Sequence, residues 1–212
     1  MQADTVTTAT ARADDAGVAG NARLTAANGL LLLVLLFIEG VTILRVRDLI
    51  TLHVFVGLML VGPVLLKTAT TGYRFTRYYA HAEPYVRRGP PHAILRLSGP
   101  LVVLTTLTVL GTGIGLLAVK PDNPGVLLFA HKASFVLWFG LMAIHVLGHL
   151  REAASESWQD VRARRGDPAG RHRGLRMIAI VTALLAGIGL AAAVTPSASA
   201  WTNRHDRGVE RH

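Results

Sequence analysis

Five apolar stretches alternate with polar segments along the chain. They cover residues 24–44, 50–70, 95–119, 126–150 and 175–194. A helix needs about 20 apolar residues to cross the hydrocarbon core of a bilayer, which is about 30 Å thick, so each stretch is long enough to span it. The pattern predicts an all-α integral membrane protein with five transmembrane helices.

The distribution of basic residues predicts how these helices are oriented. The side of the membrane that holds the N-terminal segment and the second and fourth loops has about twice as many Lys and Arg residues as the other side. Because cytoplasmic loops are rich in Lys and Arg, this side is predicted to be cytoplasmic, in a bacterial-type inner membrane. Residues 1–23 then form a cytoplasmic tail, 151–174 a cytoplasmic basic loop, and 195–212 a tail on the outside. Residues 24–150 form a four-helix bundle, and 175–194 a fifth helix.

The composition narrows the function classes. The chain is 51% hydrophobic and only 17% charged, which favours a membrane protein over a soluble domain. Its net charge of +9 is concentrated in the short loops, so topology and anionic lipid explain the charge better than nucleic acid does. The absence of cysteine excludes disulfides and metal sites held by thiolates. Redox chemistry would therefore need another cofactor.

The fourth apolar stretch, residues 127–149, contains His131, His145 and His149. His131 and His145 are fourteen residues apart, which in a helix places them about 40° apart in azimuth and about 21 Å apart along the axis. His149 lies one turn beyond His145 on the same side. Imidazoles at two levels of one inward face are what two stacked haems in a helix bundle would require.

The predicted depth of each histidine in the membrane indicates which histidines on other helices could pair with these three. The second and fourth helices are predicted to run in the same direction, so His53 and His131 begin at the same level near the outer surface. They are the predicted axial pair of an outer haem, because bundles place cofactor ligands on facing helices. At the inner level, either His145 or His149 would pair with His92 at the start of the third span.

Two other interpretations of the histidines remain open. They could be ordinary polar residues that form hydrogen bonds between helices. They could also bind zinc or copper, since imidazole suits both metals. A zinc or copper site would favour three or more ligands at one depth, whereas His53 and His131 supply two.

Glu39 lies within the first apolar stretch, nearer to its outer end. A carboxylate at the centre of a membrane helix costs at least about 2.5 kcal/mol on insertion scales, so Glu39 is predicted to face protein, cofactor or water. It could transfer protons beside the outer site, or it could be a neutral carboxyl bonded to a neighbouring helix. With Lys67 at the inner end of the second span, it is also the basis for a possible quinone site.

Other residues are predicted to surround the cofactors. Gly57 follows His53 by one turn and would let a flat ring approach the backbone. Trp138 lies between the two levels, where it would pack between haems or fill the core. The cations predicted beside haem propionates are Lys132 at the outer level and Arg74, Arg77 and Arg96 at the inner level.

The histidines fourteen apart on the fourth span, with His53 near the outer end of the second, resemble the di-haem membrane cytochromes b of the cytochrome b561 type. The membrane cytochrome subunits of formate dehydrogenase and nickel-iron hydrogenase are similar. The resemblance covers the first four spans and implies haem b, electron exchange with quinone, and a partner redox subunit or a homodimer. It implies that His53 and His131 are the outer ligands and His145 an inner one. The first span has no histidine, which departs from the family. Either His92 replaces the missing ligand or the protein holds one haem.

The sequence therefore predicts a b-type cytochrome subunit that transfers electrons between a quinone pool or inner acceptor and a redox partner. Two alternatives belong to other classes. One is a proton-coupled transporter or channel that uses Glu39 and the histidines, and the other is a haem-free membrane anchor or assembly subunit. Neither alternative predicts a visible chromophore.

Overall fold

The computed structural model describes residues 2–87, 93–119, 121, 123–162 and 172–201, with the side chains of 2–14, 93–96, 148–157 and 159–162 left undescribed. The described residues form helices and no strand. Five of the helices are long and apolar enough to cross a membrane, as the sequence predicted. The elements are α1 (Gln2–Leu44), α2 (Ile50–Tyr79), α3 (Glu83–Arg87), α4 (Ala93–Leu117), α5 (Gly125–Arg162), α6 (Arg173–Val194) and the 3₁₀ turn η1 (Thr195–Ala198).

Three helices extend beyond the predicted spans. Helix α1 begins at Gln2 rather than near residue 24, α2 continues to Tyr79, and α5 continues to Arg162. Hydropathy identifies the part of a helix that can lie in lipid, whereas a polar helix can continue past the headgroups. The predicted tail 1–23 and the first part of the predicted loop 151–174 are therefore helical.

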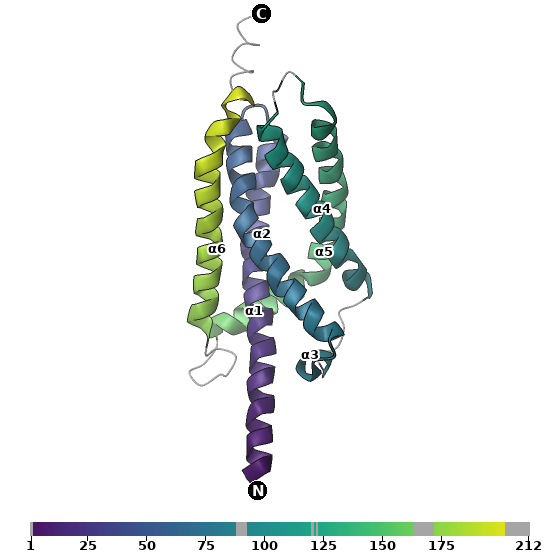
Figure 1. Ribbon diagram of the computed structural model, residues 1–212, viewed down its shortest axis with the longest axis vertical. Helices are drawn as coiled ribbons and strands as arrows, with labels where there is room; N and C mark the ends of the chain where they lie inside the picture. Colours follow the sequence, from purple (N-terminus) through teal and green to yellow (C-terminus); the bar gives the residue numbers. More distant parts are fainter. Residues whose placement is uncertain (1, 88–92, 120, 122, 163–171, 202–212) are drawn as a thin grey trace, which may run out of the picture.

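Four of the long helices form a ring. Helix α1 packs against α2 and α5, and α4 packs against the same two helices, so α2 and α5 occupy diagonal positions (Figure 1). Helix α6 lies outside this ring, against α2. The N-terminus, α3 and the start of α6 lie at one end of the molecule, and the α1–α2 turn and the start of α5 lie at the other (Figure 1). Helices α2 and α5 therefore run in the same direction, as predicted.

Backbone contact joins α2 to α6. A Cβ atom added to Gly187 would overlap the carbonyl oxygen of Met59, and one added to Gly62 would overlap the carbonyl oxygen of Ala183. Pro63 has no N–H group, so it cannot donate the helical hydrogen bond to Met59, four residues earlier. Small residues let membrane helices approach this closely. The Met59 carbonyl therefore receives no hydrogen bond from residue 63. Gly187 lets the backbone of α6 pack directly against this carbonyl.

Polar side chains join α1 to α2 further toward the N-terminal end. The amide of Asn28, which is fully buried, donates a hydrogen bond of 2.8 Å to the carbonyl oxygen of Pro63. The ammonium of Lys67 donates one of 2.8 Å to the carbonyl oxygen of Thr25, alongside Gly29. Lys67 therefore binds the α1 backbone. A contact between Lys67 and quinone remains a prediction.

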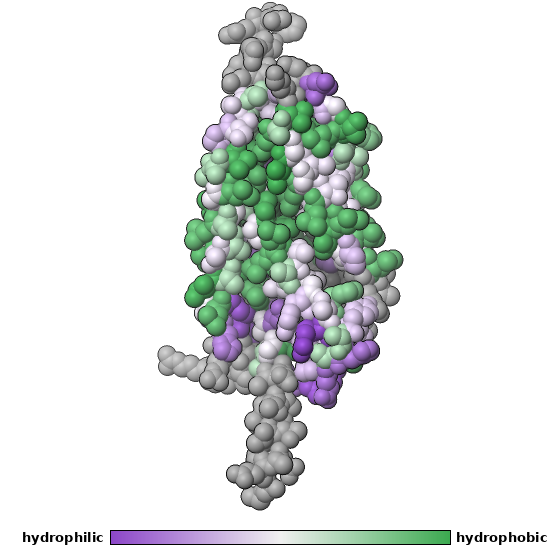
Figure 2. Space-filling model, viewed as in Figure 1, coloured by the Kyte–Doolittle hydropathy of each residue, from purple (hydrophilic) through white to green (hydrophobic). Residues whose placement is uncertain are grey.

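The outer surface of the helices is apolar. Figure 2 shows hydrophobic residues along most of the length of the bundle, and hydrophilic residues gathered toward the α3 end. Phe37, Phe129 and Leu147 each expose more than two thirds of their surface. A continuous apolar surface of this extent marks a contact with lipid or another protein. Together with the five long apolar helices, it is consistent with a multi-pass protein in contact with the lipid bilayer.

Candidate functional site

His53 of α2 and His131 of α5 meet across the diagonal of the bundle. The centres of their rings are 6.4 Å apart, and the ring planes are inclined at 75°. Both residues are partly buried. The two rings therefore lie at one level, as depth counting along parallel helices predicted, and their role as metal ligands stays a prediction.

Helix α1 supplies the contacts of the His53 ring. Nδ1 of His53 lies 2.8 Å from Oε1 of Glu39 and 3.2 Å from the hydroxyl of Thr42. Glu39 and Thr42 are three residues apart, so both project from one face of α1. The Thr42 hydroxyl also lies 3.2 Å from Oε2 of Glu39 and 2.6 Å from its backbone oxygen. The Glu39 side chain is 12% exposed, and it faces protein as the sequence predicted.

Helix α4 supplies the contacts of the His131 ring. Nδ1 of His131 lies 3.1 Å from the hydroxyl of Thr112 and 3.1 Å from the carbonyl oxygen of Val109. A Cβ atom at Gly113 would lie 3.1 Å from Cε1 of His131, so the absence of a side chain there lets the ring rest against α4. Each ring is thus supported by a neighbouring helix that has no histidine of its own.

These contacts determine which ring nitrogens are available. The Val109 carbonyl can only accept a hydrogen bond, so Nδ1 of His131 carries the hydrogen, and Nε2 of the neutral ring has a free lone pair. An ionised Glu39 has the same effect on His53. Histidines that bind metals commonly donate their second N–H to a carboxylate or a backbone carbonyl. Both rings therefore have the bonding pattern of an imidazole that is ready to act as a ligand through Nε2.

Gly57 borders the carboxyl group of Glu39. A Cβ atom at Gly57 would lie 3.4 Å from Oε1, in ordinary van der Waals contact with the group that holds His53. The predicted approach of a flat ring to Gly57 stays a prediction. In the structure, Gly57 leaves room for the Glu39 side chain.

Less of the predicted inner level is described. Nδ1 of His145 lies 3.4 Å from the hydroxyl of Ser98 on α4. The side chains of His149 and Arg96, and the whole of His92, lie outside the described residues. The pairing of His92 with His145 or His149 therefore stays a prediction.

Trp138 occupies the region between the two levels. Its indole nitrogen donates a hydrogen bond of 2.8 Å to the hydroxyl of Thr106 on α4, and its ring lies 6.1 Å from that of Phe135. These contacts account for Trp138 as a residue that packs α5 against α4. Its predicted place between two haems remains a prediction.

The predicted cations differ in their surroundings. Lys132 is exposed, and Arg74 is partly buried at the N-terminal end of the bundle. The guanidinium of Arg77 lies 5.9 Å from the centre of the Tyr85 ring, so Arg77 joins α2 to α3. The structure does not bring these three cations together.

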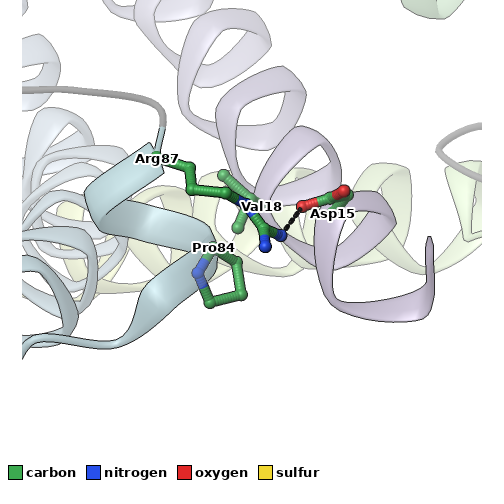
Figure 3. Close-up of a pocket in the computed structure, with 4 residues that line it drawn as sticks. All are labelled: Asp15, Val18, Pro84 and Arg87. Carbon is green, nitrogen blue, oxygen red and sulfur yellow. Dashed lines mark hydrogen bonds and ion pairs between the residues drawn. The ribbon is translucent and has the colours of Figure 1, made fainter. Parts of the chain in front are cut away.

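An open cavity lies at the end of the molecule opposite to His53 and His131. It has a volume of about 400 Å³ and is lined by Asp15, Val18, Pro84 and Arg87 (Figure 3). Arg87 lies 2.8 Å from Asp15 and 3.0 Å from Glu83, and its hydrogen bond to Asp15 raises the pKa of Arg87. The cavity is wide open. It reflects the docking of α3 on α1 and holds none of the predicted site residues.

Sequence reasoning missed the residues that hold the two rings. Thr42 and Thr112 are hydroxyl residues within apolar helices, and Val109 contributes only its backbone. Thr42 follows Glu39 by three residues, and Thr112 lies between Gly111 and Gly113, small residues of the kind that let membrane helices approach closely. These positions in the sequence were the available signs that Thr42 and Thr112 contact the histidine rings.

No protein-family model, curated protein or solved structure matches this chain.

Proposed function

We propose that this protein is a membrane b-type cytochrome in which His53 and His131 bind one haem between α2 and α5. The observation that supports this most strongly is the spacing of the rings. Two imidazoles that bind one metal from opposite sides through bonds of about 2.0–2.1 Å would have ring centres about 6.3 Å apart. The observed separation is 6.4 Å.

The hydrogen bonds of the rings support the same proposal. Haem brings four ligands of its own in the macrocycle, so His53 and His131 would be enough to hold it. Across the residues that the structure describes, there is no group of three or more His, Cys, Asp or Glu side chains suited to a metal ion. A cofactor that brings most of its own ligands fits this pair better than zinc or copper does.

Each helix of the ring then has a defined part. Helices α2 and α5 provide the ligands His53 and His131, while α1 and α4 hold Nδ1 of each ring and direct Nε2 away from themselves. When bound, haem supplies reversible one-electron chemistry, and the chain controls its ligation, its polarity and its access to water. The apolar exterior supports a location of this centre within a bilayer.

The distribution of basic residues supports an orientation. The N-terminal part of α1, α3 and the start of α6 share one end (Figure 1), and the Lys- and Arg-rich segments of the sequence adjoin these elements. By the positive-inside rule this end is cytoplasmic, and His53 and His131 lie toward the outside. Electrons would pass between a redox partner or second copy at the outer end and a quinone or inner acceptor. An inner haem at His145 would extend this path.

The contact between Glu39 and His53 favours a second candidate function. A carboxyl group 2.8 Å from an imidazole within a membrane helix bundle is also suited to passing protons in a transporter or channel. That function requires no chromophore, so it is distinguishable from the first by a spectrum.

The test is an absorption spectrum of the purified protein, recorded oxidised and dithionite-reduced, with haem quantified per chain. The protein is produced with added haem precursor. We expect a Soret band, a sharp α band on reduction, and at least one haem per chain. A correctly folded protein that has neither band, and that does not take up added haem, contradicts the cytochrome proposal and favours the proton-coupled alternative.

A further inference from the structure

The two candidate ligands are held by chemically different groups. Nδ1 of His53 faces a carboxyl group, whereas Nδ1 of His131 faces a backbone carbonyl and a hydroxyl. The carboxyl group has its own support, because the Thr42 hydroxyl lies 3.2 Å from Oε2 of Glu39 and is itself 1% exposed. The difference lies on α1, which itself has no histidine.

We propose that Glu39, held by Thr42, is the positioning residue that keeps His53 in its Nδ1–H tautomer and makes it the more strongly donating of the two ligands. The proposal rests on the proposed function for its redox consequence. The tautomer itself concerns the chain alone. The proposal thus gives α1 a role in the site through Glu39, although this helix has no histidine.

The contact with Glu39 determines which nitrogen of the His53 ring carries the hydrogen. A neutral imidazole has one N–H, and it can be on either nitrogen. The Glu39 oxygen 2.8 Å from Nδ1 favours the hydrogen there, and thus leaves the Nε2 lone pair for iron. A carboxylate acceptor also draws the Nδ1 hydrogen toward itself, which makes Nε2 a stronger donor than a backbone carbonyl does.

A more strongly donating ligand beside a negative charge stabilises ferric over ferrous iron. The reduction potential of the haem is set by its axial ligands and their hydrogen bonds. Replacing Glu39 by glutamine keeps an oxygen acceptor of the same shape but removes the charge. The haem should stay bound, and its midpoint potential should rise.

Thr42 should act through Glu39. The hydroxyl contacts both Glu39 and His53, so removing it loosens the carboxyl group as well as the ring. Thr42→Val is therefore expected to shift the potential in the same direction as Glu39→Gln. Residues in one hydrogen-bond network give non-additive effects, so the double variant should shift the potential by less than the two single shifts combined.

The experiment measures the midpoint potential, the electron paramagnetic resonance of the ferric haem, and the haem content of Glu39→Gln, Glu39→Ala and Thr42→Val. Glu39→Gln should raise the potential with haem content unchanged. Glu39→Ala should weaken haem binding by about 10- to 100-fold, as the loss of a group that orients a metal ligand typically does. The control is Asp48→Asn, which removes an exposed negative charge that pairs with Arg45 at the same end of the molecule. It should leave all three readouts unchanged.

A second measurement uses the haem-free protein with ¹⁵N-labelled histidine. Nitrogen chemical shifts report which ring nitrogen carries hydrogen, and His53→Gln assigns the His53 signal by its disappearance. We expect the Nδ1–H tautomer in the wild-type protein and a mixture of tautomers in Glu39→Ala.

The outcomes separate the two proposals. A wild-type protein without haem overturns the proposed function, and the nitrogen shifts still decide the part of Glu39. A haem-containing protein whose potential is the same in Glu39→Gln, or an Nε2–H tautomer in the haem-free wild type, overturns the positioning role alone. A potential that shifts equally in Asp48→Asn assigns the effect to general charge and also overturns it.

Discussion

Purified His53→Ala and His131→Ala proteins are expected to lose the haem of the outer site. Each substitution removes one of two protein ligands from rings 6.4 Å apart. Loss of a residue that only orients a ligand costs about 10- to 100-fold in metal affinity, so loss of the ligand itself should weaken binding by more than about 100-fold. The measurement is the haem content per chain, with the Soret and reduced α bands as its spectral readout.

Two further histidine variants act as controls. His172→Ala changes an exposed residue at the start of α6 and should leave the haem content unaltered. His145→Ala changes a partly buried histidine on the same helix as His131, near Ser98 of α4. It should leave the outer haem in place, and if the protein holds two haems it should remove one. Retention of the full haem content by both His53→Ala and His131→Ala would contradict the proposed ligand pair.

Gly187→Ala is expected to destabilise the protein, although alanine is the better helix former. The added Cβ atom would overlap the Met59 carbonyl oxygen, and a backbone carbonyl cannot turn away as a flexible side chain can. Overpacking of this kind costs about 1–3 kcal/mol, which exceeds the gain of about 1 kcal/mol in helix propensity. The measurement is the free energy of unfolding in a mixed detergent, or the thermal midpoint of the purified protein.

Gly189→Ala is the matched control. Gly189 is on the same helix, and a Cβ atom there would meet no other atom within 4 Å. With the clash absent, only the helix propensity changes, so this variant should be as stable as the wild type or slightly more so. The two glycine substitutions are thus expected to differ in sign. Equal effects at both positions would show that α6 does not contact the α2 backbone as described.

The helices could be predicted from the sequence because each apolar stretch satisfies the length that a bilayer requires. The level of His53 and His131 was also predictable, since depth depends only on residue number and helix direction. The ends of α1, α2 and α5 could not be predicted from the sequence. The polar residues that follow an apolar stretch fit a loop or a surface helix equally well by hydropathy.

The partners of the rings could not be predicted for a different reason. Which residue faces Glu39 depends on the rotation of α1 about its own axis relative to α2, and that rotation is set by packing between the helices. Thr112 likewise became a partner of His131 only when α4 packed against α5. The sequence predicted α6 only as a fifth helix, and its close contact with α2 depends on Gly187 meeting one particular carbonyl.

The contact between α2 and α6 has a consequence for the behaviour of the site on heating. Because Gly62 and Gly187 meet the opposite backbone directly, this part of the interface has no side-chain rotamers that could change. Sliding α2 along α6 would drive backbone atoms into one another. His53 is therefore expected to keep its height in the bilayer at temperatures that already loosen the lipid-facing side chains.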